Sequence, residues 1–147
     1  MTTKDETTRR EAEAWAELEA AVAAVPEERL ETPALDGGWS VKDVLWHVAY
    51  WWDDFVRASR EGWAEDPGET DDVNEREFHR SRALPWVEVR AQVDDARDRL
   101  LEVWSHVATD DADGIAWFVE ETIDHYPEHL PQVRSLADDP TVKARSA

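Results

Sequence analysis

Residues 38–47 read Gly-Trp-Ser-Val-Lys-Asp-Val-Leu-Trp-His, and this stretch contains a strong signal for the start of a helix. Ser40 is a favourable N-cap, and Asp43 at the third helical position can complete a capping box with it. Apolar residues then recur at helical spacing and predict one buried stripe: Val41, Val44, Leu45, Val48, Trp52 and Phe55. Gly62 predicts the end of this helix. His47 falls at the edge of the stripe, and therefore at the rim of the predicted core.

Residues 125–129 read His-Tyr-Pro-Glu-His and place two histidines four positions apart. Such a pair projects from one face of a helix and can bind one metal ion together. In a chain with five histidines, the pair alone is weak evidence for a metal site. However, His47, His125 and His129 all lie at the margin of an apolar stripe. The closure of a helix bundle can therefore bring all three to one end of the core.

Two other long helices are predicted. The first spans 8–25, since Thr8 and Glu11 can form a capping box and four apolar residues follow at helical spacing: Trp15, Leu18, Val22 and Val25. The other spans about 85–107, with a buried stripe of Val89, Val93, Ala96, Leu100, Val103 and Trp104. His106 falls on its opposite, polar face. We therefore expect His106 to be dispensable for metal binding.

The stretch at 61–72 is polar and contains a predicted Pro-Gly turn at 67–68. A short irregular helix is predicted to follow at 73–83. His79 lies in this irregular segment, so we expect it to be dispensable for metal binding as well.

The last predicted helix buries Ile115, Phe118, Val119, Thr122, Tyr126, Leu130 and Val133. Pro127 and Pro131 lie within this pattern, and each removes a backbone hydrogen bond. The helix should therefore kink or restart near the histidine pair. Together, these patterns predict an all-α fold, a four-helix bundle in a single domain covering 1–147.

Composition restricts the partners and the compartment. The chain has 35 acidic and 16 basic residues, a formal net charge of −19 and a pI near 4.4. A surface of this charge repels phosphate backbones and anionic lipid headgroups, so we expect no nucleic-acid or membrane partner. No apolar run approaches the roughly 20 residues needed to cross a bilayer, and the first ten residues are unlike a signal peptide. The expected location is cytoplasmic.

Cysteine is absent from the chain. This excludes disulfides, thiolate metal ligands and a nucleophilic thiol of the protein's own. Any thiol chemistry would require an external low-molecular-weight thiol.

The order of these motifs resembles a known family. An N-terminal helix, the stretch at 38–47, Val73-Asn74, and Thr-Ile-Asp-His-Tyr-Pro-Glu-His at 122–129 look like the DinB-like superfamily. This superfamily includes YfiT-type proteins and the mycothiol-dependent maleylpyruvate isomerase. The resemblance covers nearly the whole chain.

The resemblance implies a four-helix bundle and a divalent metal site. In the family, one histidine from the second helix and two residues four apart on the last helix bind the metal, which map here onto His47, His125 and His129. Fold does not fix the reaction, because the superfamily contains thiol-dependent transferases and isomerases, a hydrolase, and many members with no assigned reaction.

Three neutral imidazoles leave an open coordination position on a metal ion. Zinc is the first expectation, and nickel, iron, cobalt and manganese are alternatives, because imidazole ligands select weakly among these metals. Glu121, one turn before His125, is a candidate to orient an imidazole or to transfer protons. Trp51 and Phe55 are expected to line a substrate pocket.

Two classes of function remain open. The first is a metal-dependent enzyme that acts on a small electrophilic substrate, as a transferase of an external thiol or as a hydrolase. The second is a non-catalytic small-ligand-binding or stress protein with a structural metal site. Trp46 and Trp117 point away from their stripes, which is compatible with a homodimer contact.

Overall fold

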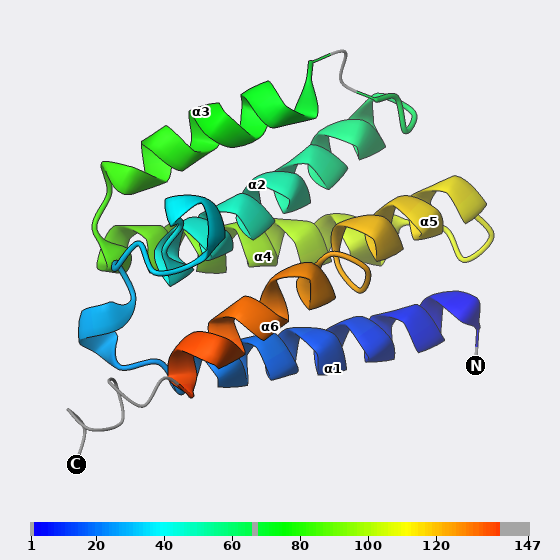
Figure 1. Ribbon diagram of the computed structural model, residues 1–147. Coiled ribbons are helices and arrows are strands. Elements are labelled where there is room, and N and C mark those ends of the chain that lie inside the picture. The colour runs from blue at the N-terminus through cyan, green and yellow to red at the C-terminus, as the bar shows by residue number, and fades with distance from the viewer. Residues whose placement is uncertain (1, 66–67, 139–147) are drawn as a thin grey trace.

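The computed structural model describes residues 2–65 and 68–138, most of which are helical (Figure 1). These residues contain no strand, which confirms the all-α prediction. The turn expected at 67–68 falls partly outside the described residues, because position 67 is not among them. The α-helices are α1 (Thr3–Ala23), α2 (Val41–Arg60), α3 (Thr70–Arg82), α4 (Trp86–His106), α5 (Ala112–Glu121) and α6 (Tyr126–Ala137), and two short 3-10 helices (Glu27–Arg29 and Asp36–Gly38) lie between α1 and α2.

The helices form the expected four-helix bundle with one addition. Helices α1, α2 and α4 are three of its members, and α5 and α6 together make the fourth. Figure 1 shows α6 lying along α1, while α2 packs against α4 and α5. Helix α3 packs on the outside of α2. The bundle therefore encloses one core, and α3 covers part of α2.

Helix α3 corrects the prediction of a short irregular helix at 73–83. It is a regular helix of 13 residues that begins three residues earlier, at Thr70. Acidic residues in its first turn and basic residues in its last turn complement the helix dipole. Ser81 is fully buried and donates a hydrogen bond to Asp43 Oδ1 on α2 at 2.5 Å. Charge placement and this buried contact stabilise a helix that lacks a strong apolar stripe.

The start of α2 matches its prediction. The Ser40 backbone N–H donates to Asp43 Oδ2 at 2.8 Å, and the Asp43 N–H donates to Ser40 Oγ at 3.1 Å. All six residues of the predicted stripe are buried, and the helix ends at Arg60, just before Gly62. The α4 stripe is buried as predicted except for Val103, which is only partly buried, and His106 is exposed.

The predicted start of the first helix is wrong. Helix α1 begins at Thr3, and its capping box is formed by Thr2 and Asp5. Thr8 instead lies inside the helix and donates a hydrogen bond to the Lys4 carbonyl at 2.9 Å. Glu11 is not a capping residue, because its side chain is buried in the bundle. The same Thr-x-x-acid pattern occurs at both places, and the earlier one starts the helix.

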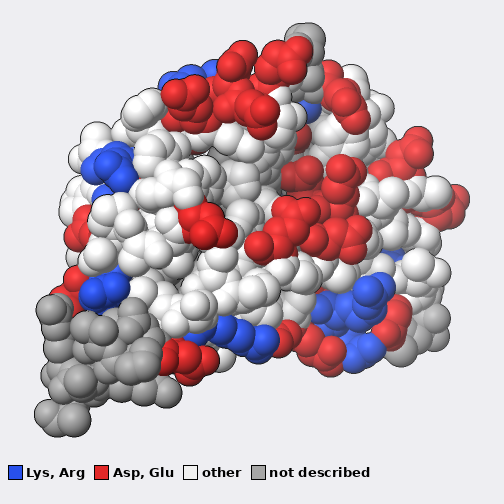
Figure 2. Space-filling view, viewed as in Figure 1, with Lys and Arg blue, Asp and Glu red and all other residues white. Residues whose placement is uncertain are grey.

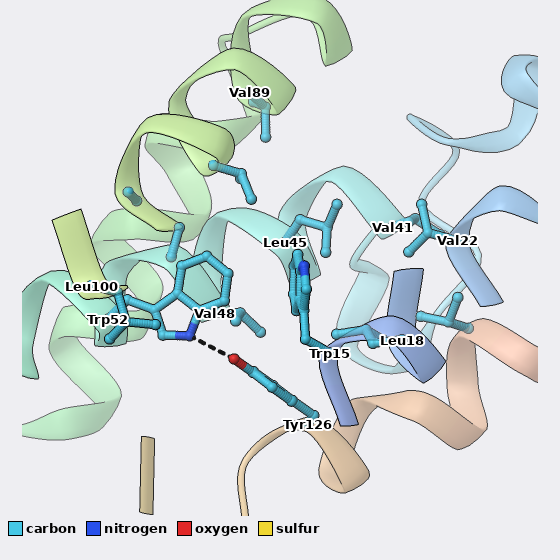
Figure 3. Close-up of a cluster of buried hydrophobic side chains, with 14 of the residues drawn as sticks. Trp15, Leu18, Val22, Val41, Leu45, Val48, Trp52, Val89, Leu100 and Tyr126 are labelled. Carbon is cyan, nitrogen blue, oxygen red and sulfur yellow. Dashed lines mark hydrogen bonds between the residues drawn. The ribbon is translucent and has the colours of Figure 1, made fainter. Parts of the chain in front are cut away.

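Glu11 belongs to a buried polar network at the centre of the core. Arg97 of α4 binds its carboxylate through two hydrogen bonds of 2.9 and 2.8 Å. The Tyr126 hydroxyl donates to Glu11 Oε2 at 2.7 Å. The same hydroxyl accepts a hydrogen bond from Trp52 Nε1 at 3.1 Å (Figure 3). The network joins α1, α2, α4 and α6. Because Tyr126 directly follows His125, it also fixes the start of α6.

The last predicted helix is interrupted where the prolines suggested. Helix α5 ends at Glu121, and α6 restarts at Tyr126, with Pro127 in its first turn. Proline is well tolerated there because the first N–H groups of a helix have no intrahelical partner. Thr122 leaves the helical conformation, and its hydroxyl donates to the Phe118 carbonyl at 2.6 Å. The break allows α5 to pack on α2 while α6 packs on α1.

Candidate metal centre

The three predicted ligands converge. His47 projects from α2, His125 immediately precedes α6, and His129 lies one turn further along α6. Nε2 of His125 lies 3.0 Å from Nε2 of His47 and 3.0 Å from Nε2 of His129. One ligand atom from each residue lies within 4.8 Å of the others. Metal–imidazole bonds of about 2.0–2.1 Å place neighbouring nitrogens roughly 3.0–3.4 Å apart, so this spacing fits a shared ion.

Burial keeps all three imidazoles neutral. It lowers the pKa of His47 to about 3, and the neighbouring His125 and His129 contribute to this shift. Burial also lowers the pKa of His125 and of His129 to about 4. At neutral pH the rings are therefore deprotonated, which is the form that binds metal. Three nitrogens this close could not all carry a proton without strong repulsion.

Hydrogen bonds from the surrounding chain orient two of the rings. The His125 imidazole bonds to the backbone carbonyl of Glu121, and the His47 imidazole bonds to the Asn74 side chain. Asn74 Oδ1 also accepts a hydrogen bond from Trp51 Nε1 at 3.1 Å. With Nε2 turned towards the centre of the cluster, such contacts hold an imidazole in the orientation that a metal requires.

The sequence alone did not reveal the role of Asn74. Its segment was expected to be irregular, whereas regular helix α3 carries it over α2 and beside His47. A signal was present, because a lone polar amide follows Val73 in a segment otherwise rich in charged side chains. Only the packing of α3 on α2 connects that amide to the histidines.

A cavity of about 300 Å³ lies beside the cluster, with these lining residues: His47, Trp51, Thr70, Asn74, Glu120, Glu121, His125 and Glu128. A second cavity of about 150 Å³ shares Trp51, Thr70, Glu120 and Glu121 with it, so the two adjoin. The remaining lining residues of the second are Tyr50, Asp54, Glu65, Gly68, Val73 and Trp117. Two of the three histidines, His47 and His125, therefore line a space large enough for a small molecule.

Trp51 and Phe55 lie in different surroundings. Trp51 forms part of the wall of both cavities. The expectation for Phe55 is corrected, because its side chain is fully buried in the core and lines neither cavity. Its ring packs against Trp63 and Phe118, at centroid distances of 5.3 and 5.6 Å.

Glu121 borders both cavities. Burial raises the pKa of its carboxyl group to about 8, and repulsion from Asp54, Glu120 and Glu128 adds to this shift. At neutral pH this side chain is mostly protonated, so it can donate a proton. The carboxyl group thus has suitable chemistry for the candidate role, which stays a prediction.

The other singled-out residues lie away from the cluster. The side chains of His79 and His106 are 69% and 76% exposed. Trp46 and Trp117 are partly buried against the core of their own chain, and Trp117 packs near Trp63 at a centroid distance of 6.1 Å. Neither indole N–H has a hydrogen-bond partner within the described part of the chain. The homodimer contact stays a prediction.

An all-α bundle with a group of three neutral imidazoles, two of which line a cavity, is compatible with a metal-binding enzyme. The chain belongs to the DinB superfamily, whose family model matches residues 12–132 and thus includes all three histidines. Among solved structures, the chain is similar to an uncharacterised protein from Escherichia coli UTI89, with a TM-score of 0.79. The two share 14% identity, and the match covers 97% of this chain and 96% of the other, so this likeness concerns the fold.

The chain matches no curated protein. Within 2–65 and 68–138, no helix combines the length and the apolar character that crossing a membrane requires.

Proposed function

We propose that this protein is a metal-dependent enzyme that acts on a small electrophilic substrate. One observation carries the proposal: Nε2 of His47, His125 and His129 converge beside a cavity of about 300 Å³. Neutral imidazoles suit zinc, and they also accept nickel, iron, cobalt or manganese.

The number of ligands favours an enzyme over a structural site. A structural zinc site usually has four protein ligands, whereas a catalytic site has three and keeps one position open. The group found among the described residues contains three histidines and no carboxylate. The nearby cavity provides space for a substrate at the open position.

The residues around the centre then have separate tasks. The histidines supply three neutral donors, and Asn74 holds the ring of His47. A bound divalent ion supplies Lewis acidity and lowers the pKa of a water or thiol that it coordinates. Glu121, with its pKa raised to about 8, holds a proton that it can deliver to a leaving group. Because the chain has no cysteine, a thiol-transfer reaction would use an external low-molecular-weight thiol.

Metal analysis of untagged protein, purified without chelator, tests this proposal. We expect one divalent ion per chain, and loss of that ion in the double variant His125→Ala, His129→Ala. His106→Ala is the matched control and should keep its metal. Full metal content in the double variant would refute the assignment.

Cobalt substitution tests the open position. Addition of mycothiol or bacillithiol should produce a sulfur-to-cobalt charge-transfer band if the enzyme uses that thiol. If the cobalt coordination responds to neither thiol but still exchanges water, hydrolysis is favoured over thiol transfer. A cobalt centre that exchanges no ligand would refute the catalytic proposal.

A further inference from the structure

The walls of the two cavities carry an uneven distribution of charge. Five acidic side chains lie on them: Asp54, Glu65, Glu120, Glu121 and Glu128. No lysine or arginine is among the described residues that line either cavity. Figure 2 shows acidic side chains gathered between α3 and α5 on the viewed face.

Elsewhere, acidic side chains in this bundle are often paired with arginine. Examples include Glu19 with Arg90, Glu11 with Arg97 and Asp53 with Arg99. At the cavities only Asp54 has such a partner, Arg57, at 2.9 Å. The side chains of Glu120, Glu121 and Glu128 form no ion pair or hydrogen bond within the described ranges. The formal charges of Glu120 and Glu128 are therefore left without a counter-charge from these residues, whereas Glu121, with its pKa raised to about 8, is mostly protonated at neutral pH.

The two cavities differ in the residues that line them. The larger cavity reaches His47 and His125, while the smaller one extends away from them along Asp54 and Glu65. Aromatic rings also border the smaller cavity, from Tyr50, Trp51 and Trp117. Aromatic faces next to carboxylates attract organic cations, because both the ring quadrupole and the negative charge favour them.

We propose that the substrate of this centre carries a positively charged ammonium or guanidinium group. This inference rests on the proposed function, since the reactive end of the substrate faces the three histidines. The cationic end occupies the smaller cavity, between the aromatic rings and the carboxylates. Anionic substrates and anionic thiols are disfavoured by the same charges.

Three small thiols of similar size provide the probes: cysteamine, 2-mercaptoethanol and 3-mercaptopropionate, which add a positive, a neutral and a negative group. Their binding to the cobalt-substituted protein is measured through the sulfur-to-cobalt band. Because these thiols differ in intrinsic acidity, the informative quantity is how the affinity ratio changes between protein variants. The variant compared with the unmodified protein is the double substitution Glu120→Gln, Glu128→Gln. Both positions are exposed, so the substitutions leave the core intact.

We expect the ratio of cysteamine to 3-mercaptopropionate affinity to fall by about tenfold in this double variant at low salt. High salt should reduce the ratio in the unmodified protein, because ions screen exposed charges. Glu102→Gln is the control for total charge, since Glu102 lines neither cavity, and it should leave the ratio unchanged. An unchanged ratio in the double variant would overturn the proposal.

Failure of the proposed function is distinguishable from failure of this inference. If the protein binds no cobalt, the metal proposal fails. The charge preference is then measured on the metal-free protein by calorimetric titration with benzyltrimethylammonium and with phenylacetate. Preferential binding of the cation, lost in the same double variant, supports the acidic cavity as a cation site. Equal or weaker binding of the cation overturns it.

Discussion

Substitution of Glu11 by alanine should destabilise the metal-free protein by about 3–5 kcal/mol, the typical cost of removing one partner from a buried ion pair. The Glu11 side chain is 2% exposed and the Arg97 side chain is 18% exposed. Water can therefore replace few of the hydrogen bonds that Arg97 loses. The substitution removes two hydrogen bonds from Arg97 and one from Tyr126. Since small domains are stable by about 5–15 kcal/mol, this loss is a large fraction of the total.

Urea denaturation, followed by tryptophan fluorescence and by circular dichroism, measures this loss. The metal-free protein is the proper starting material, because a bound ion would add stability in proportion to its concentration. Glu13→Ala is the matched control on α1, since Glu13 forms an exposed ion pair with Arg9. We expect the control to cost no more than about 1 kcal/mol.

A double substitution separates the loss of the ion pair from the burial of an unpaired charge. In Glu11→Met, Arg97→Met neither charge remains, so much of the stability should return. If Glu11→Ala lowers the free energy of unfolding by less than about 1 kcal/mol, the argument is refuted, because leaving a buried charge unpaired costs more than that. Equal losses in Glu11→Ala and in the double variant would show that the damage comes from packing instead.

Three further predictions concern the candidate centre. In the folded protein the three histidines have pKa values of about 3 to 4, against an ordinary 6.5, so the unfolded chain takes up protons first as the pH falls. Urea titrations of the metal-free protein should therefore show the free energy of unfolding decreasing from pH 6.5 towards pH 4. The decrease should be smaller in His47→Phe. The pKa of Glu121 is about 8 in the folded protein, against an ordinary 4.5. Its contribution to stability is therefore full below pH 4.5 and is lost as the pH rises through 8. Glu121→Gln should be more stable than the unmodified protein at pH 9 and about equally stable at pH 4.5. Asn74→Ala should weaken metal binding by about 10-fold or more, measured by chelator competition, because the ring of His47 loses its orienting contact; an unchanged affinity would exclude this role.

Local signals in the sequence were sufficient for much of the fold. The Ser40 cap and the apolar stripe of α2 required no information from other parts of the chain. The same stripe placed His47 at its margin, and the histidine pair at 125–129 followed from spacing alone. Helix periodicity thus predicted that three residues from distant parts of the sequence lie together in one metal site, and the geometry supports this prediction.

Features that depend on contacts between helices could not be predicted in the same way. Glu11 resembled a capping residue, and its real partner, Arg97, lies 86 positions away. Trp51 and Phe55 are one turn apart on α2, so helical phase places them on a similar side. The apolar stripe already predicted that Phe55 is buried, but only the packing of α5, which sets Phe118 against its ring, shows that Phe55 lines neither cavity. Helical periodicity contains no information about which neighbour covers a given face.

The three histidines come from two distant parts of the sequence, so a shared ion would also affect the conformational entropy of the chain. His47 lies on α2, and His125, 78 positions later, immediately precedes α6. An ion held by both would act as a reversible cross-link that closes a long loop. By the chain-entropy relation used for disulfides, closing a loop of this length restricts the unfolded chain by about 4.5 kcal/mol. In a protein without cysteine, such an ion would be the cross-link between distant parts of the chain, and its removal should make the chain more susceptible to proteases.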